Sequence, residues 1–298
     1  MAKLGTISLR HRIQDWMAAA LLEGLRPLPY RRRIALLGWL GVHVVGPLAG
    51  LRSRVRNNLD MVAPELPAAE RNRIARQVPG NMARTIGEIF AGAEFVAHAK
   101  QAKLEGSGLA HLHDAHAKGQ PVILVTGHLG NYDAARALLL AQGFKVAGFY
   151  MPMRNPAFNA RYVAAISRIG TPVFARGRDG LAKMLRFLRQ GGMVGLVTDH
   201  YMHHGALLDF MGQPARTALS AAEMALKYNA LLVPVYGIRQ PDGLGFHVRI
   251  EAPVPHSDPV TMTRALNASL ETLVRQNMDQ WMWTHRRWKK NRVEDMDA

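Results

Sequence analysis

Apolar and polar residues are arranged in two different ways along this chain, and the change comes near residue 120. Before it, apolar residues recur three and four positions apart, which predicts helices over residues 57–103 and 109–118. After it, short apolar runs of strand length alternate with helical stretches. The pattern therefore predicts an α/β fold in which helices precede a layered strand–helix region.

The second region contains six runs with the length and composition of strands and five with helical periodicity. The predicted strands are residues 122–126, 144–150, 172–175, 193–198, 231–238 and 246–250. The predicted helices are residues 132–142, 156–169, 179–189, 217–228 and 260–278. Such an alternation is typical of a mixed central sheet flanked by helices.

The first thirty residues combine apolar and basic side chains. Leu9, Ile13, Trp16 and Met17 fall on one face of a helix, with arginines beside them. A basic amphipathic helix can lie on a membrane surface, and it can equally pack on the protein's own core. The sequence leaves both alternatives open.

An uncharged stretch of 18 residues follows, from Ile34 to Leu51, with arginines on both sides. A helix of that length spans roughly 27 Å, which is marginal for crossing a bilayer. We interpret it as a membrane-embedded or re-entrant anchor rather than a soluble core helix. The predicted division is an anchor over residues 1–56 and a single α/β domain over residues 57–298.

The most informative stretch is Val122–Gln142, in which a buried strand turns into a helix. His128 follows the end of the strand, and Asp133 falls in the first turn of the helix. Catalytic groups in open α/β sheets gather at this edge, where an imidazole oriented by a carboxylate can act as a general base. The amides around Gly130 and Asn131 are candidates for stabilising an oxyanion. The alternative is a surface histidine beside a helix-capping aspartate.

Other polar residues follow neighbouring predicted strands. Arg154 comes after the second strand, and Arg176 and Arg178 come after the third, where a guanidinium can bind phosphate or carboxylate. Asp199 ends the fourth strand, either to orient a substrate hydroxyl or as a strand-end cap.

The charge balance indicates an acidic partner. Lys and Arg number 38 against 22 Asp and Glu, which gives a net charge of +16 and a pI near 10.7. Nucleic acid, anionic lipid headgroups and an acidic protein all fit that charge. No nucleic-acid module with stacking aromatics among basic residues is present, so we expect no nucleic-acid partner.

The sequence predicts no metal site and no disulfide. It contains no cysteine, which excludes thiolate catalysis and cysteine–zinc sites. The spacing of His111, His113 and His116 does not align three ligands on one helix face, and the adjacent His203 and His204 point apart.

The segment from Trp281 to Lys290 mixes tryptophans with basic residues. This composition is typical of a segment that seeks a membrane interface, and a solvated basic tail is the alternative.

Several segments together resemble a known family. They are GHLGNYD (127–133), YMPMRNP (150–156), VTDHYMHHG with the following residues up to Leu-Val-Pro-Val (197–235), and QWMWTHRRWKK (280–290). The chain resembles the bacterial lipid A biosynthesis (lauroyl/myristoyl) acyltransferases, within the glycerolipid acyltransferase superfamily. Members of this branch usually carry Glu where Asp133 stands.

The resemblance implies transfer of a fatty acyl chain from acyl carrier protein to a hydroxyl of a lipid A precursor or related glycolipid, without a cofactor. It implies His128 as the base, Asp133 as its partner, and Arg154, Arg176 or Arg178 on phosphate. It also implies an inner-membrane location with the catalytic domain facing the cytoplasm.

Three alternatives remain at this point. One is an acyltransferase acting on a lysophospholipid or another membrane lipid. Another is a non-catalytic basic protein that binds anionic lipid. The third is a hydrolase, which needs a protein nucleophile that the stretch around His128 does not offer.

Overall fold

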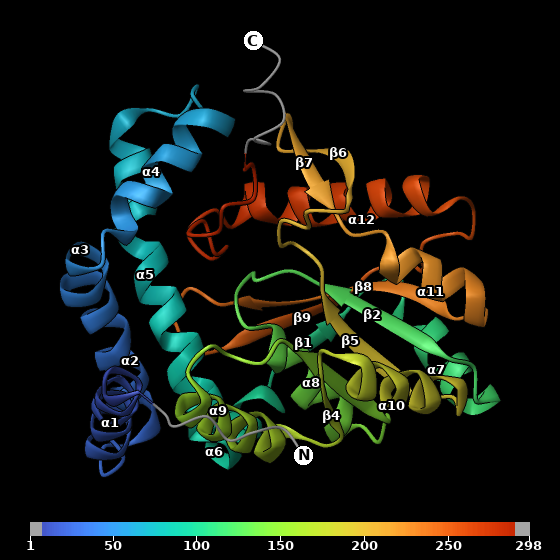
Figure 1. The fold of residues 1–298 in the computed structure, drawn as a ribbon, viewed down its shortest axis with the longest axis horizontal. Coiled ribbons are helices and arrows are strands. Elements are labelled where there is room, and N and C mark those ends of the chain that lie inside the picture. The colour runs from blue at the N-terminus through green and yellow to red at the C-terminus, as the bar shows by residue number, and fades with distance from the viewer. Residues whose placement is uncertain (1–7, 290–298) are drawn as a thin grey trace.

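The computed structural model describes residues 8–289. Figure 1 shows a central sheet with helices on both faces and a group of N-terminal helices standing beside it. Residues 1–7 and 290–298 lie outside the described part, and with them Lys290, the last residue of the predicted interface-seeking segment.

The strands are β1 (Lys103–Glu105), β2 (Val122–Thr126), β3 (Val146–Tyr150), β4 (Val173–Ala175), β5 (Met193–Val197), β6 (Ala206–Phe210), β7 (Gln213–Thr217), β8 (Leu231–Arg239) and β9 (Phe246–Ile250).

The helices before β2 are α1 (Leu9–Gly24), α2 (Tyr30–Leu40), the π-helical turn η1 (Gly41–Val45), α3 (Gly46–Leu48), α4 (Leu51–Val62), α5 (Ala68–Ala91), α6 (Ala93–Ala99) and α7 (Leu109–Lys118). Those after it are α8 (Tyr132–Ala141), α9 (Pro156–Ile169), α10 (Arg178–Arg189), α11 (Ser220–Tyr228) and α12 (Pro259–Gln276).

Seven strands form one mixed sheet in the order β1-β9-β8-β2-β5-β3-β4. Only the β8–β9 pair of this sheet is antiparallel. The predicted α/β fold with a mixed central sheet is confirmed. In the pairing of β2 with β5, Thr126 lies opposite Val197, so the residues that follow both strands leave the sheet at the same edge.

The centre of the sheet is covered on both faces, because every residue of β2 is buried. Val122 and Leu124 pack with side chains of α7 and α8 on one face. Ile123 and Val125 pack with side chains of α10, α11 and α12 on the other. Successive side chains of a strand point to opposite faces of the sheet, so an apolar run can be buried only if both faces are covered.

Three strands were not predicted from the sequence. β1 is a three-residue strand at the sheet edge beside β9. β6 and β7 form a separate antiparallel hairpin. Its turn is Met211–Gly212, with φ angles of 61° and 73°, as a tight hairpin turn requires.

The prediction for the segment after α12 was wrong where the structure describes it. Trp281, Trp283 and Trp288 are buried and pack against one another and against the hairpin. The ring of Phe210 in β6 lies 5.6 Å from that of Trp281. The tryptophans therefore form core and do not face a membrane.

The membrane-embedded or re-entrant anchor stays a prediction. Within residues 8–289 no single helix is long and apolar enough to cross a bilayer, and the pair Tyr30–Leu48 and Leu51–Val62, which together reach the required length and composition, is bent by 83°. Tyr30–Leu48, the first member of this pair, packs closely on α5. A Cβ added at Gly41 would lie only 2.4 Å from the carbonyl oxygen of Pro79 in α5. The division at residues 56 and 57 stays a prediction, and α4 runs across it.

Candidate active site

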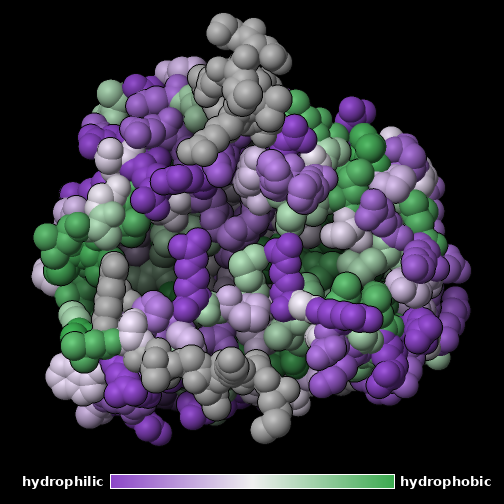
Figure 2. Space-filling model, in the orientation of Figure 1, coloured by the Kyte–Doolittle hydropathy of each residue, from purple (hydrophilic) through white to green (hydrophobic). Residues whose placement is uncertain are grey.

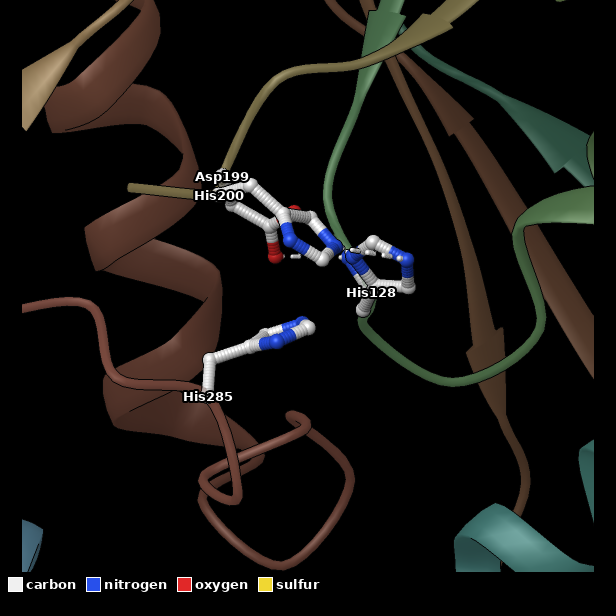
Figure 3. Close-up of side chains that lie close together, drawn as sticks. All are labelled: His128, Asp199, His200 and His285. Atoms are coloured by element: carbon white, nitrogen blue, oxygen red, sulfur yellow. Dashed lines mark hydrogen bonds and ion pairs between the residues drawn. The ribbon is translucent and has the colours of Figure 1, made fainter. Parts of the chain in front are cut away.

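His128 and Asp199 meet at the carboxyl edge of the sheet. The Nδ1 atom of His128 lies 2.7 Å from Oδ1 of Asp199. The backbone N–H of His128 donates to Oδ2 of the same carboxylate over 2.7 Å. β2 and β5 are hydrogen-bonded neighbours, and each residue follows the end of its strand, so the pairing of the strands fixes the pairing of the side chains (Figure 3).

Asp199 is buried and fully engaged. Besides the two bonds from His128, its Oδ2 accepts a hydrogen bond of 2.8 Å from Nε1 of Trp281. Burial by itself opposes ionisation, but the imidazole charge and the hydrogen bonds from His128 outweigh it and hold the pKa of Asp199 well below its usual range. The site therefore contains a fixed negative charge behind the imidazole.

This geometry selects one form of the His128 ring. A carboxylate only accepts, so the neutral imidazole carries its hydrogen on Nδ1 and keeps a lone pair on Nε2. An imidazole in that state can remove a proton from a hydroxyl, and Asp199 stabilises the imidazolium that forms. The pair therefore has the chemistry that a general base requires.

Two more histidines complete the cluster of His128, Asp199, His200 and His285. Nε2 of His200 lies 3.4 Å from Nε2 of His128. The ring of His285, from the segment after α12, lies 3.9 Å from that of His200 and 4.8 Å from that of His128. Loss of hydration in this packed group, with the nearby charge of His128, lowers the pKa of His200 to about 4 and that of His285 to about 3.

Asp133 does not contact His128, which corrects the predicted pair. Its Oδ1 accepts a hydrogen bond of 2.7 Å from Nε of Arg136, one helical turn further along α8, and both side chains are buried. Arg136 also donates to the carbonyl oxygens of Gly170 and Ile166 at the end of α9. Because α8 begins at Tyr132, Asp133 is held on the helix and faces α9.

The amides of Gly130 and Asn131 are likewise not free for an oxyanion, contrary to the prediction. Gly130 N–H donates to the carbonyl of Gln280 over 3.1 Å, and Asn131 N–H donates to that of Gly237 over 2.8 Å. Gly130 has φ +58°, and a Cβ there would lie 2.1 Å from the Gly237 oxygen. These two residues tie the His128 loop to β8 and to the segment after α12.

A buried ion pair supports the loop from behind. Glu88 of α5 and Arg239 of β8 form a salt bridge in which both side chains are almost completely buried. The same carboxylate accepts a hydrogen bond from the Asn131 amide group over 2.8 Å, and the Asn131 oxygen caps α8 by accepting from Asp133 N–H. The loop is therefore fixed by contacts with α5 and β8 before any substrate binds.

A polar cavity of about 620 Å³ lies between α5, β8 and the end of α12. Asn81, Arg84, Arg239 and Gln280 are among its lining residues, and none of the four cluster residues is. The cluster therefore faces a different part of the surface.

Comparison with known proteins decides the family. Residues 4–290 match the family model described as bacterial lipid A biosynthesis acyltransferase. The chain belongs to this family. As a member it is an acyltransferase, and the resemblance seen in its sequence segments is confirmed.

Curated relatives agree over most of their length. The chain is 26% identical over 275 residues to a lipid A biosynthesis acyltransferase of Haemophilus influenzae, covering 90% of this chain and 85% of that protein. It is 25% identical over 282 residues to a lipid A biosynthesis lauroyltransferase of Escherichia coli K12, covering 92% and 90%. A phosphatidylinositol mannoside acyltransferase of Mycobacterium tuberculosis is 23% identical over 195 residues, covering 64% and 62%.

In this member of the family the three predicted phosphate-binding arginines surround the same edge of the sheet without joining the cluster. Arg154 follows β3, Arg176 follows β4 and Arg178 begins α10, and all three side chains are exposed. The guanidinium of Arg176 lies 4.0 Å from the sulfur of Met202, which follows His200 by two residues.

Sequence reasoning missed part of the site. Asp199 was predicted to orient a substrate hydroxyl, whereas in the structure it is hydrogen-bonded to His128. His200, His285 and Trp281 were not candidates, although all three lie within segments that carried the family resemblance. The signal available was the position of Asp199 and His200 after an apolar strand, but nothing in the sequence places His285 beside them.

Proposed function

We propose that this protein transfers a fatty acyl chain from acyl carrier protein to a hydroxyl of a lipid A precursor or a related glycolipid, at the inner membrane. The observation that carries the proposal is the His128–Asp199 pair, a base with an oriented imidazole in a chain of the lipid A acyltransferase family. A non-catalytic lipid-binding protein has no need of such a pair.

The reaction follows from the state of the imidazole. Nε2 of His128 takes the proton of the acceptor hydroxyl as its oxygen attacks the thioester carbonyl of the donor. The tetrahedral intermediate collapses with loss of the thiolate, which receives the proton back from the imidazolium. An ester and a free thiol result, so no cofactor is consumed. Asp199 lowers the energy of the charged imidazolium between the two proton transfers.

Charge supports an acidic donor and a phosphorylated acceptor. The net charge is +16, and Arg154, Arg176 and Arg178 are exposed at the reactive edge of the sheet. We expect replacement of the phosphate-binding arginine with alanine to raise KM for the acceptor, and replacement with lysine to restore it partly, because an ammonium lacks the planar fork of a guanidinium. Unchanged KM in all three alanine variants would rule these residues out.

Exposed apolar side chains on the N-terminal helices support membrane contact. Leu9 and Trp16 of α1 are 72% and 70% exposed, and Trp39 and Leu48 of the α2–α3 unit are 53% and 84% exposed. Figure 2 shows apolar surface at the side of the molecule where α2 and α3 lie. A surface with apolar side chains beside many arginines suits the boundary of an anionic membrane. The use of acyl carrier protein would place the site on the cytoplasmic side.

Vesicle sedimentation tests this surface. Leu48→Glu should weaken binding to vesicles that contain anionic lipid, because a carboxylate replaces an apolar side chain in the contact. Leu207→Glu is the matched control, since Leu207 is 53% exposed on the β6–β7 hairpin, away from these helices. Equal binding by both variants and the wild type would contradict membrane docking through α2 and α3.

The transfer assay tests the function itself. Full-length protein in detergent is given acylated carrier protein and, in separate reactions, a lipid A precursor, a lysophospholipid and a phosphatidylinositol mannoside. We expect turnover on the lipid A precursor and a loss of about 10²–10⁴-fold in His128→Ala. His203→Ala, an exposed histidine outside the cluster, is the control and should keep its rate. Near-wild-type turnover in His128→Ala would leave the lipid-binding alternative standing.

A further inference from the structure

The cluster of His128, Asp199, His200 and His285 brings one potential metal-ligand atom from each residue within 4.8 Å of the others. The four side chains come from three separate segments and point toward one another (Figure 3). We infer that this cluster binds a divalent transition-metal ion, Zn²⁺ fitting best, and that the bound ion inhibits acyl transfer. The binding site stands on the geometry alone, and its inhibitory effect rests on the proposed function.

The separation of two nitrogens carries the argument. Nε2 of His128 and Nε2 of His200 lie 3.4 Å apart. Two imidazole nitrogens on one tetrahedral zinc ion, each about 2.0–2.1 Å from the metal, lie roughly 3.3–3.4 Å from each other. Zinc therefore fits between these atoms without moving them. The same distance is long for a hydrogen bond between the two rings.

His285 supplies a third nitrogen that has no other use. Its Nε2 is buried and has no hydrogen-bond partner within the described part of the chain. A buried polar atom in that state is costly unless something satisfies it. Because the centroid of the His285 ring lies 3.9 Å from that of the His200 ring, an ion held by the other two histidines lies within its reach.

Asp199 acts in this site from behind the ligands. It holds Nδ1–H of His128 and thereby leaves Nε2 as the atom that faces the ion. A carboxylate behind a metal-binding histidine is the usual way that proteins orient such a ligand. Its charge also offsets the nearby guanidinium of Arg287, which donates to the carbonyl of Arg216 and the hydroxyl of Thr217.

The type of ligand atom determines which ion the cluster prefers, and the position of one ligand atom explains why the ion should inhibit acyl transfer. Imidazole nitrogens favour Zn²⁺, Cu²⁺ and Ni²⁺, whereas Mg²⁺ and Ca²⁺ prefer oxygen. A metal on Nε2 of His128 occupies the lone pair that has to accept the proton of the acceptor hydroxyl. The ion and the reaction therefore compete for one atom, and a chelator should relieve the inhibition.

Direct binding is measured first, on full-length protein in detergent after treatment with a chelator. Competition with a chromophoric zinc indicator gives the affinity, and the visible absorption of Co²⁺ reports a tetrahedral nitrogen site. We expect one ion per chain, and a loss of at least about tenfold in affinity in His200→Asn and in His285→Asn. His203→Asn, an exposed histidine next to His204, is the matched control and should bind like the wild type.

His200→Asn keeps the test informative if His285→Asn fails to fold, because His200 lies at the surface. Circular dichroism checks the fold of each variant. Equal zinc affinity in the wild type, in the folded cluster variants and in His203→Asn would overturn the assignment of the site.

Inhibition is measured second. For each variant, the transfer rate with added metal is compared with the rate of the same variant without metal. Zn²⁺ should inhibit the wild type and Mg²⁺ should not, and the midpoint for zinc should rise by at least about tenfold in the cluster variants. The claim of inhibition is overturned if acyl transfer requires zinc. It is also overturned if zinc binds to the cluster and the transfer rate does not change. If the protein transfers acyl chains but does not bind zinc, only the metal site is contradicted. If it binds zinc at the cluster but does not transfer acyl chains, the metal site stands and the proposed function is contradicted.

Discussion

Asp133 and Asp199 are both buried carboxylates beside the loop that carries His128, yet each accepts hydrogen bonds from a different set of donors. Asp199, at the end of β5, accepts from the imidazole and the amide of His128 and from Trp281. Asp133, in the first turn of α8, accepts from Arg136. One acid belongs to the reactive edge of the sheet, and the other joins α8 to α9.

The difference follows from which neighbours the fold gives each residue. Asp133 is five positions from His128 in the chain, but the helix that starts between them holds its side chain on the α9 side. Asp199 is 71 positions away, and the pairing of β2 with β5 brings it to the imidazole. The order of strands in the sheet, and not closeness in sequence, therefore determines which carboxylate contacts His128.

The largest expected effect separates the two acids in the transfer assay. In Asp199→Asn the amide group can donate to Nδ1, which moves the imidazole hydrogen to Nε2 and removes the base, so the rate should fall by about 10²–10⁴-fold. Asp133→Asn should keep a rate near that of the wild type per folded molecule. The reverse ranking would mean that Asp133 reaches His128 in the working enzyme.

The next effect concerns stability. Asp133→Ala leaves the buried guanidinium of Arg136 without its carboxylate, and removing one partner of a buried pair costs roughly 3–5 kcal/mol. Urea unfolding followed by circular dichroism measures it. Glu70→Ala is the control, because Glu70 pairs with Arg73 at the surface, where the pair contributes little. Equal midpoints for both variants would show that the Asp133–Arg136 pair is not structural.

A smaller effect tests how Asp199 is oriented. Trp281→Phe keeps most of the buried ring but removes the Nε1–H that donates to Oδ2 of Asp199. Loss of a group that orients a catalytic residue from behind should lower the rate by about tenfold, with KM unchanged. Trp283→Phe is the control, because its Nε1–H donates to a backbone carbonyl instead. Similar rates in both variants would contradict the role given to Trp281.

The smallest effect is a dependence of stability on pH. The folded protein keeps His200 neutral down to its pKa of about 4 and His285 neutral down to about 3, whereas the unfolded chain takes up protons below the ordinary value of 6.5. Stability should therefore fall as the pH drops from 6.5 toward 4, by no more than about 1.4 kcal/mol per pH unit for the partly buried His285, and by less for His200, whose exposed ring is screened by water. In urea titrations with a chelator present, His285→Asn should show a shallower slope than the wild type. An equal slope would show that His285 is not the source.

Most strands of the central sheet could be predicted because they are rich in apolar residues, whereas the edge strand β1, which is Lys-Leu-Glu, was missed. The predicted bounds of β2 and β9 agree with the structure, and those of β5 and β8 differ by one residue at their ends. The β6–β7 hairpin escaped prediction because its strands carry Asp209, Pro214 and Arg216, and its turn is Met-Gly rather than a common hairpin dipeptide. The pattern of apolar residues therefore located the buried centre and missed the polar periphery.

Only part of the site could be predicted, because apolar patterns locate buried strands and do not show which strands are neighbours. His128 could be found because it follows a recognisable buried strand. Its partners depend on which strands are neighbours, and a single sequence does not contain that order. Composition also misled: tryptophans beside arginines indicate an interface, but here Trp281 and Trp283 fill the core. Arg287 is buried too, and its two terminal nitrogens donate to carbonyl and hydroxyl oxygens.

The place of Trp281 and His285 in the chain affects how the protein is made. Both follow the last strand and the last described helix, while His128 comes before the midpoint of the sequence. A ribosome thus releases the sheet and the loop well before it releases the residues that cover them, and domains begin to fold during synthesis. Until Gln280 emerges, the Gly130 amide has no acceptor and the Asp199 carboxylate has no indole. Translation that stops short of these residues would leave the central sheet formed, but His128 and Asp199 without the side chains that cover them.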